Sequence, residues 1–193
     1  MKTVYFDVDT QVDFMFPAGA LYVPGAEGII GAVAGMNRHA AATRSPLVST
    51  MDAHLEDDPE FREWPAHCIG GTFGQQKVPG TMLAERLVVP WIDWAERIDG
   101  IPQLVLEKRS VNCFTNPNLD GLLLAFNADC YVVYGVVTEV CVKFAVQGLL
   151  ERGHRVEIVT DAVKELDSAA AQALLKDLSS RGAVLKQAAC YLL

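Results

Sequence analysis

Residues 130–142 of the chain read CYVVYGVVTEVCV. The first eight of them form a nearly continuous apolar run, which is typical of a strand buried on both faces of a sheet. From residue 138 the apolar residues follow a helical spacing, so the sequence predicts a strand that passes directly into a helix. Cys141 lies at the start of that helix. Most free cysteines in apolar surroundings are simply packed in a core, so a reactive role for Cys141 needs support from the rest of the chain.

The succession of a short apolar strand and a helix recurs along the chain. Strands are predicted at residues 3–9, 46–52, 103–108, 130–137, 156–162 and 183–192, and helices at residues 25–43, 80–97, 118–126, 138–152 and 167–181. Continuous apolar strands that alternate with helices predict a parallel sheet covered by helices on both faces. We therefore expect an α/β protein with three α/β/α layers and a mainly parallel, six-stranded sheet. Its length suits a single domain over residues 1–193.

The composition is that of a soluble globular protein and argues against several other classes. The longest apolar runs are much shorter than the roughly 18–20 residues that span a bilayer, and Asp7 and Asp9 interrupt the region where a signal peptide needs apolar residues. Five cysteines without a CxxC spacing suggest neither a disulfide framework nor a thiolate zinc site, and Cys130 and Cys190 are expected in the core. A net charge of −8 without a Lys/Arg cluster argues against nucleic acid and anionic membranes as partners. We expect a cytoplasmic protein with a small-molecule substrate.

Four chemically capable residues lie where predicted strands end. Asp9 ends the first strand, Asp52 the second and Lys108 the third, and Cys141 follows the fourth. Ligands of open α/β sheets bind beyond the carboxyl ends of the strands. Each residue alone has an ordinary explanation, such as an acid in a turn or a solvated lysine. Their convergence on one edge of the sheet nevertheless predicts a reactive site.

These residue types suit nucleophilic catalysis by a cysteine. The thiolate is the reactive form, and a helix N-terminus or a neighbouring cation such as Lys108 lowers the pKa of a thiol. A carboxylate such as Asp9 can take the proton of the Cys141 thiol and return it to a leaving group. Backbone N–H groups of residues 137–141 would stabilise a tetrahedral intermediate. The sequence thus predicts acyl transfer without a catalytic histidine.

Two of the four histidines lie in the loop region that follows the second predicted strand. Asp52 and His54 are separated by one residue, and His67 follows within residues 53–79. Two imidazoles and a carboxylate suit zinc, iron or manganese. The spacing alone is weak evidence for a metal, so ordinary loop residues remain an alternative at this point. His39 and His154 lie in contexts typical of structural or exposed histidines.

Several longer motifs occur along the chain: DTQVDFMFPAGALYVPGAE (9–27), DAH (52–54), WPAHCIGGTFG (64–74), EKRS (107–110) and GVVTEVCV (135–142). In order and spacing they resemble the nicotinamidases (pyrazinamidases) of the isochorismatase-like cysteine hydrolase superfamily, over nearly the whole chain. The resemblance implies the isochorismatase-like hydrolase fold. It also implies a metal-dependent amidohydrolase that converts nicotinamide to nicotinate and ammonia through a cysteine thioester. We further expect a homo-oligomer.

The resemblance implies roles for individual residues in catalysis. Asp9, Lys108 and Cys141 match the catalytic triad of the family. The family has a cis peptide bond that corresponds here to Val136–Val137, and the backbone N–H groups of Val137 and Cys141 would form the oxyanion hole. On this basis Cys141 is expected to be the nucleophile rather than a packed core residue.

The same resemblance implies a metal site and a substrate pocket. Asp52, His54 and His67 match the family's metal ligands, with Zn²⁺ as the usual ion and Fe²⁺ or Mn²⁺ as alternatives. Such an ion would bind the pyridine nitrogen of the substrate. Phe14 and Trp64 match aromatic residues that enclose the pyridine ring, although aromatic residues beside loops are often only packed.

The chain departs from the family pattern in three places, one of which is Gln75-Gln76 where A-E usually follows G-T-x-G. A further histidine often follows the DAH motif in the family; here Asp57, Asp58 or Glu60 could reach the metal, or water could fill the position. After the EKRS motif the family commonly has a Y-S-x-F pattern, and Phe114 and Asn118 are the candidates to replace it here. This last difference leaves a related amidase, acting on another small carboxamide or ureide, as an alternative. An isochorismatase or a catalytically silent binding protein fits less well, because the cysteine and metal motifs are intact.

Overall fold

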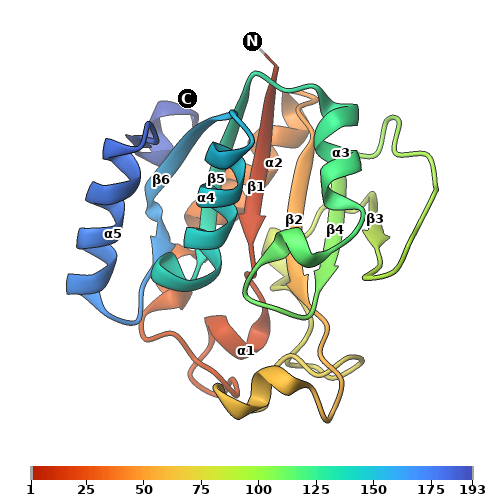
Figure 1. Cartoon of the computed structure of the whole chain (residues 1–193), viewed down its shortest axis with the longest axis vertical. Helices are drawn as coiled ribbons and strands as arrows, with labels where there is room; N and C mark the ends of the chain where they lie inside the picture. Colours follow the sequence, from red (N-terminus) through yellow and green to blue (C-terminus); the bar gives the residue numbers. More distant parts are fainter. Residues whose placement is uncertain (1, 193) are drawn as a thin grey trace.

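The computed structural model describes residues 2–192, so the two ends of the predicted domain, residues 1 and 193, lie outside the described residues. Seven parallel strands form one sheet in the order β3-β4-β2-β1-β5-β6-β7 (Figure 1). They are β1 (Thr3–Val8), β2 (Leu47–Asp52), β3 (Arg86–Val89), β4 (Gln103–Lys108), β5 (Cys130–Val136), β6 (Arg155–Lys164) and β7 (Val184–Lys186). The central strand is β1, and β5 lies next to it. Every residue of β5 is buried, which explains its continuous apolar sequence.

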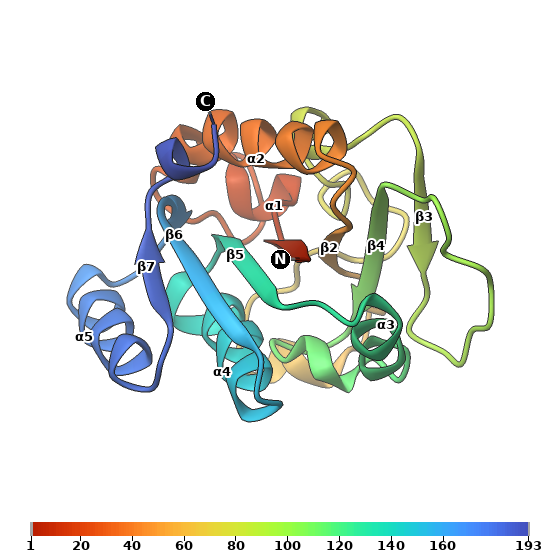
Figure 2. The ribbon, with the colours of Figure 1, turned by 90° about the horizontal axis from the view of Figure 1, so that it is seen from above.

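Helices cover both faces of the sheet, which confirms the predicted α/β/α layers. They are α1 (Val12–Met15), α2 (Ile30–Ala42), α3 (Leu119–Phe126), α4 (Lys143–Glu151) and α5 (Ser168–Ser180). One face is covered by α2, and the other by α3, α4 and α5 (Figure 2). Shorter helical turns occur at Ala26–Ile29, Pro59–Arg62, Pro79–Thr81, Cys113–Thr115, Thr138–Val142 and Ala188–Cys190. Within residues 2–192, none of the helices combines the length and apolar character that crossing a bilayer requires.

The sheet has one strand more than the six predicted, and the predicted helix 80–97 is wrong. Residues Arg86–Val89 form the edge strand β3, which pairs with β4, and residues 90–102 are irregular. Three of the four residues of β3 are exposed or half-buried, so this strand lacks the continuous apolar pattern of the others. The β-branched Val88 and Val89 favour a strand, and Pro90 prevents a helix from continuing through the segment.

All strands run in the same direction, so their carboxyl ends meet at one edge of the sheet, the lower end in Figure 1. Asp52 and Lys108 are paired across β2 and β4, and Val8 is paired with Gly135 across β1 and β5. The φ angle of Gly135 is 116°, and a Cβ atom there would lie 2.1 Å from the carbonyl oxygen of Val8. Glycine therefore allows β5 to approach β1 closely, directly before the segment that carries Cys141.

Candidate active site

Asp9, Lys108 and Cys141 come together at this edge of the sheet. Asp9 directly follows β1, Lys108 is the last residue of β4, and Cys141 lies in the helical turn after β5. The Lys108 Nζ atom lies 2.9 Å from Oδ2 of Asp9 and 3.7 Å from Sγ of Cys141. All three side chains are buried. A nucleophile, a cation and a carboxylate are thus within reach of one another and largely shielded from water.

Lys108 also contacts Asp52, with its Nζ atom 2.5 Å from Oδ1, so one ammonium group serves two carboxylates. Burial disfavours the charge of Lys108, but Asp52 and Asp9 outweigh burial and hold the lysine pKa well above its ordinary value. Burial also opposes the charge of Asp52, yet Lys108 and the two nearby histidines lower the pKa of that carboxyl group. For Asp9, burial outweighs Lys108 and raises the pKa. Asp9 is therefore the carboxylate of this pair that more readily accepts a proton.

The Cys141 thiol is not poised as a thiolate in this arrangement. Burial raises the pKa of the thiol well above its ordinary value; Lys108 opposes this, but the charges of Asp9 and Asp52 add to it. The sequence predicts a lowered pKa from the helix N-terminus and Lys108. That prediction is wrong, chiefly because the thiol is buried, and also because the charges of Asp9 and Asp52 oppose the effect of Lys108. Formation of the thiolate thus requires transfer of the thiol proton, and Asp9 is the neighbouring base.

Cys141 is carried by a helical turn that is wider than an α-helix. In the turn Thr138–Val142 the N–H of Val142 donates to the carbonyl of Val137, 3.1 Å away and five residues earlier. Turns of this π type are rare and frequently occur at functional sites. The cis peptide bond expected between Val136 and Val137 is present. Val137 and Cys141, whose backbone N–H groups are the candidate oxyanion donors, border the same cavity.

Asp52, His54 and His67 form a compact, buried cluster of candidate metal ligands. One ligand atom from each lies within 4.8 Å of the others. Oδ2 of Asp52 lies 3.8 Å from Nε2 of His54 and 3.8 Å from Nε2 of His67. Two ligand atoms of a tetrahedral zinc ion, with bonds of about 2.0–2.1 Å, lie about 3.3–3.5 Å apart. The two distances from Asp52 to the histidines are thus a few tenths of an ångström longer than a zinc site requires, and the cluster as a whole spans at most 4.8 Å.

The hydrogen bonds around the two histidines fit a metal site. Among residues 2–192, neither ring nitrogen of His54 has a hydrogen-bond partner, although Oδ2 of Asp58 lies 3.1 Å from its Nδ1 atom. The Nδ1 atom of His67 lies 2.7 Å from the carbonyl oxygen of Pro65, which leaves Nε2 facing Asp52. Ligating histidines commonly direct their second ring nitrogen to a carboxylate or a backbone carbonyl in this way. The donor set therefore fits a divalent cation that binds nitrogen and oxygen.

Of the three acids considered for the metal, Glu60 is the one that borders the cavity. Its Oε1 atom lies 3.7 Å from Nε2 of His54, and its Oε2 atom accepts a hydrogen bond from the N–H of Val111 at 3.1 Å. Burial and the charge of Asp52 raise the pKa of Glu60. Asp58 lies on the Nδ1 side of His54, and Asp57 is exposed. Glu60 is thus the acid best placed to complete a coordination shell, directly or through water.

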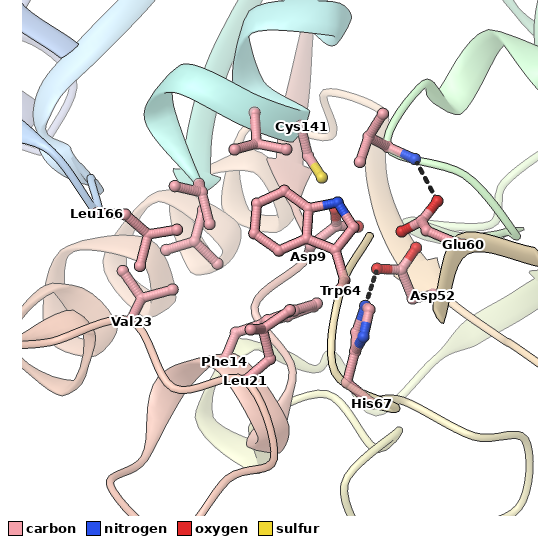
Figure 3. Close-up of a pocket in the computed structure, with 14 residues that line it drawn as sticks. Asp9, Phe14, Leu21, Val23, Asp52, Glu60, Trp64, His67, Cys141 and Leu166 are labelled. Carbon is pink, nitrogen blue, oxygen red and sulfur yellow. Dashed lines mark hydrogen bonds and ion pairs between the residues drawn. The ribbon is translucent and has the colours of Figure 1, made fainter. Parts of the chain in front are cut away.

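The candidate nucleophile and two of the three candidate metal ligands, Asp52 and His67, line one cavity (Figure 3). Its lining residues are Asp9, Phe14, Leu21, Val23, Asp52, Glu60, Trp64, His67, Val111, Val136, Val137, Val140, Cys141 and Leu166. Asp52, Glu60 and His67 gather on one side, whereas Val23 and Leu166 lie on the opposite side. The aromatic residues expected from the sequence, Phe14 and Trp64, both border the cavity. The arrangement suits a small ligand with a flat ring and one polar end.

The apolar side of the cavity is tied to the turn that carries the cysteine. Oε1 of Glu139 accepts hydrogen bonds from the backbone N–H groups of Leu166, at 2.9 Å, and Asp167, at 2.7 Å. Asp167 in turn caps the N-terminus of α5. The sequence analysis did not predict Leu166 as a cavity residue. Its position just after β6, at the same edge of the sheet as the other site residues, could have indicated it.

Three further expectations from the sequence are wrong. Phe114 does not border the cavity; its ring lies under the guanidinium group of Arg152, at 3.9 Å. Asn118 holds the irregular segment 90–94, because its Nδ2 atom donates to the carbonyl groups of Pro90 and Ile92. Val111 borders the cavity instead of either residue. Cys190, expected in the core, is exposed, because it lies in a short turn near the end of the chain.

Comparison with known proteins agrees with this geometry. Residues 3–190 match the isochorismatase domain family. The chain is 24% identical to a nicotinamidase of Escherichia coli (strain K12) over 204 residues, which cover 92% of this chain and 91% of that protein. It is similar to a pyrazinamidase of Pyrococcus horikoshii in complex with zinc (27% identity, TM-score 0.81, 97% and 99% of the two chains covered). It is also similar to an N-carbamoylsarcosine amidase from Thermoplasma acidophilum (26% identity, TM-score 0.78, 97% of each chain covered). Because the family match spans nearly the whole sequence, the chain belongs to the isochorismatase domain family.

Proposed function

We propose that the protein is a metal-dependent cysteine amidohydrolase that converts nicotinamide to nicotinate and ammonia. The observation that carries this proposal is that two clusters, Asp9–Lys108–Cys141 and Asp52–His54–His67, meet at one cavity. Asp9 and Cys141 of the first cluster line that cavity, and so do Asp52 and His67 of the second. A cysteine nucleophile suits the carboxamide carbon, and a nitrogen-binding cation suits the pyridine ring. Similarity to a nicotinamidase and to a zinc-containing pyrazinamidase supports the same substrate class.

Asp9, Lys108 and Cys141 would carry out the chemistry. The Asp9 carboxylate accepts the proton of the Cys141 thiol while the sulfur attacks the carboxamide carbon. Lys108 stabilises the negative charge that develops on sulfur and on Asp9, since its Nζ atom lies within 3.7 Å of the first and 2.9 Å of the second. The backbone N–H groups of Val137 and Cys141 hold the oxyanion of the tetrahedral intermediate.

Collapse of that intermediate breaks the C–N bond. Asp9 returns its proton to the departing nitrogen, so ammonia leaves and a thioester remains on Cys141. A water molecule then attacks the thioester and gives its proton to Asp9. The second intermediate releases nicotinic acid, which ionises to nicotinate in water, and Asp9 restores the proton of the Cys141 thiol. The raised pKa of Asp9 suits a group that must both accept and return a proton in each cycle.

Binding of the pyridine ring would depend on the second cluster. A divalent cation held by Asp52, His54 and His67, most simply Zn²⁺ with Fe²⁺ or Mn²⁺ as alternatives, would supply a Lewis acid for the ring nitrogen. Phe14 and Trp64 would contact the ring, and exclusion of water by these side chains would favour attack by sulfur. Together with the cation, the two aromatic side chains would orient the carboxamide over Cys141.

Ammonia release from nicotinamide by the purified protein tests this function. We expect turnover by the wild-type protein and none by Cys141→Ala, which should remain folded because only one sulfur atom is removed. Benzamide, which lacks the ring nitrogen, should be a poor substrate. Hydrolysis of benzamide as fast as nicotinamide, by a protein that holds no metal, would contradict the proposal and leave a generic cysteine amidase.

The similarity to an N-carbamoylsarcosine amidase makes a small ureide the second candidate substrate. An N-carbamoyl amino acid carries a carboxylate, which needs a cationic partner in a binding site. Among residues 2–192, however, the cavity lining includes neither Lys nor Arg, so the proposed metal ion would be the partner left for such a carboxylate. Leu21, Val23, Val140 and Leu166 make another part of the lining apolar, which suits a ring better than a charged chain. Nicotinamide is therefore the better match, and N-carbamoylsarcosine serves as a comparison substrate in the same assay.

A further inference from the structure

A second buried ion pair lies next to the catalytic cluster, and the mechanism above does not use it. Asp7 in β1 and Lys77 approach to 3.2 Å, from Oδ2 to Nζ, and both side chains are fully buried. Neither residue borders the cavity. Removing two charges from water is costly, and a pair of hydrophobic residues would often stabilise a fold equally well. The pair therefore calls for an explanation beyond stability.

Asp7 is held by side chains from several elements. Its Oδ1 atom accepts a hydrogen bond from Oγ1 of Thr10 at 2.8 Å. Its Oδ2 atom accepts hydrogen bonds from Nδ2 of Asn37 in α2 and from Oγ of Ser49 in β2, each at 3.1 Å. Asn37 also accepts a hydrogen bond from the hydroxyl group of Tyr134 in β5 at 2.6 Å. The carboxylate is thus fixed relative to α2, β2 and β5, and fully bonded buried networks of this kind are rigid.

Thr50 links this network to the catalytic carboxylate. Its carbonyl oxygen accepts a hydrogen bond from Nζ of Lys77 at 3.2 Å. Its hydroxyl group donates to Oδ1 of Asp9 at 2.6 Å and accepts from the backbone N–H of Asp9 at 3.2 Å. The Lys77 ammonium group therefore holds the backbone of Thr50, and the side chain of Thr50 orients Asp9.

Thr10 provides a second link, through the backbone. It directly follows Asp9, and its hydroxyl group donates to Asp7. Its carbonyl oxygen accepts a hydrogen bond from the N–H of Val78, the residue after Lys77, at 2.9 Å. The chain on the C-terminal side of Asp9 is thus attached to Asp7 directly and to the backbone of the residue that follows Lys77.

Asp9 needs such support because its backbone is strained. Its φ angle is 49°, in the left-handed region that residues with a side chain rarely adopt. A residue persists in this conformation only where its surroundings hold it there. The same conformation places Oδ2 of Asp9 2.9 Å from Nζ of Lys108.

We propose that the Asp7–Lys77 ion pair is a positioning device for catalysis: through Thr10 and Thr50 it holds Asp9 in the strained orientation that lets this carboxylate serve Cys141. This inference rests on the proposed role of Asp9 as the base of a cysteine hydrolase. Asp7 and Lys77 are positioning residues, since they touch neither the cavity nor the sulfur atom.

The test is the double variant Asp7→Asn/Lys77→Met, which removes both charges with little change in volume and leaves no buried charge unpaired. We expect it to fold, as judged by circular dichroism and thermal melting. For nicotinamide, kcat should fall about tenfold or more while KM stays within about twofold, because misplacement of a base affects the chemical step rather than binding. Alkylation of Cys141 by iodoacetamide should slow in parallel, measured in a Cys190→Ser background that removes the exposed thiol.

The matched control is Arg155→Met/Glu157→Gln, which removes the 2.6 Å ion pair on β6. It should keep the wild-type kcat and alkylation rate. A folded Asp7→Asn/Lys77→Met variant with the wild-type kcat and alkylation rate would overturn the proposal and make the pair purely structural. If that variant does not fold, Thr10→Val/Thr50→Val removes the hydroxyl groups of both links, and an unchanged kcat there would equally overturn it. A wild-type protein without activity on nicotinamide would refute the proposed substrate, whereas the alkylation comparison would still decide the positioning role.

Discussion

Replacement of Lys108 by methionine removes the positive charge shared by Asp9, Asp52 and Cys141 and nearly keeps the side-chain volume. At the observed 3.7 Å from Nζ to Sγ, and with an effective dielectric constant of about 20, the ammonium group stabilises a thiolate by about 4–5 kcal/mol. Loss of one preorganised electrostatic group in other enzymes costs about 10²–10³ in kcat, or about 2.7–4 kcal/mol. We therefore expect kcat for nicotinamide to fall by about 10²–10³ in Lys108→Met.

The same substitution should also destabilise the fold. Breaking a buried ion pair by removing one partner costs about 3–5 kcal/mol, a large part of the roughly 5–15 kcal/mol that holds a typical domain together. Lys108→Met leaves Asp9 and Asp52 facing each other without a cation. The double variant Asp9→Asn/Lys108→Met removes one of these charges, so it should melt at a higher temperature than Lys108→Met. Its kcat should nevertheless be no higher than that of Lys108→Met, because it also lacks the base.

The assay combines three measurements on the same preparations: thermal melting, ammonia release over a range of pH, and the rate at which iodoacetamide labels Cys141. Lys176→Met, a change of the same type on the exposed side of α5, is the matched control and should behave as the wild type. A folded Lys108→Met protein whose kcat is within about threefold of the wild type, with an unchanged pH–rate profile, would refute the role assigned to this charge.

Three further outcomes are expected. Burial raises the pKa of Asp9, so kcat/KM should already fall at a pH above the ordinary carboxyl pKa of about 3.9. A kcat/KM that stays constant down to about pH 3.9 would contradict the role of Asp9 as base. Elemental analysis should find about one divalent ion per chain in the wild type and none in Asp52→Ala/His54→Ala, and a wild-type protein without metal would refute the metal site. Removal of the ion by a chelator should raise KM for nicotinamide. Leu166→Ala should raise KM by up to about tenfold at unchanged kcat, whereas the control Val184→Ala, at the exposed edge of the sheet, should leave KM unchanged. A wild-type KM in Leu166→Ala would show that Leu166 is not part of the binding site.

The interior of the fold could be predicted from the sequence, whereas its edge could not. The segment CYVVYGVV is apolar on both faces because β5 is covered on both sides, and this pattern leads directly to a parallel sheet between helix layers. By contrast, β3 contains four residues and pairs with one neighbour, β4. Because most of its side chains are at least half-exposed, β3 lacks the continuous apolar run of a central strand. The apolar residues around it could therefore be taken for the spacing of a helix. Short edge strands depend on tertiary pairing more than on local sequence.

The candidate site divides in a similar way. Residues directly at strand ends, such as Asp9, Asp52 and Lys108, could be predicted to converge, because parallel strands bring their carboxyl ends to one edge. Glu60 and Val111 lie 51 positions apart and meet through a hydrogen bond between two irregular loops, which no local pattern encodes. The direction of the Cys141 pKa could not be predicted either. It depends first on the burial of the thiol and then on the carboxylates around Lys108, and both are properties of the assembled site.

Asp52 joins the two halves of the site through its two carboxylate oxygens. Oδ1 contacts Nζ of Lys108 at 2.5 Å, whereas Oδ2 lies 3.8 Å from Nε2 of His54 and of His67. The negative charge of Asp52 is one of the causes that raise the pKa of Cys141. With a cation at Oδ2, part of that charge would be neutralised, and more of the Lys108 charge would act on Asp9 and the sulfur atom. Metal binding and activation of the nucleophile would therefore be coupled through one carboxylate, and we predict that metal removal slows the alkylation of Cys141 even when no substrate is present.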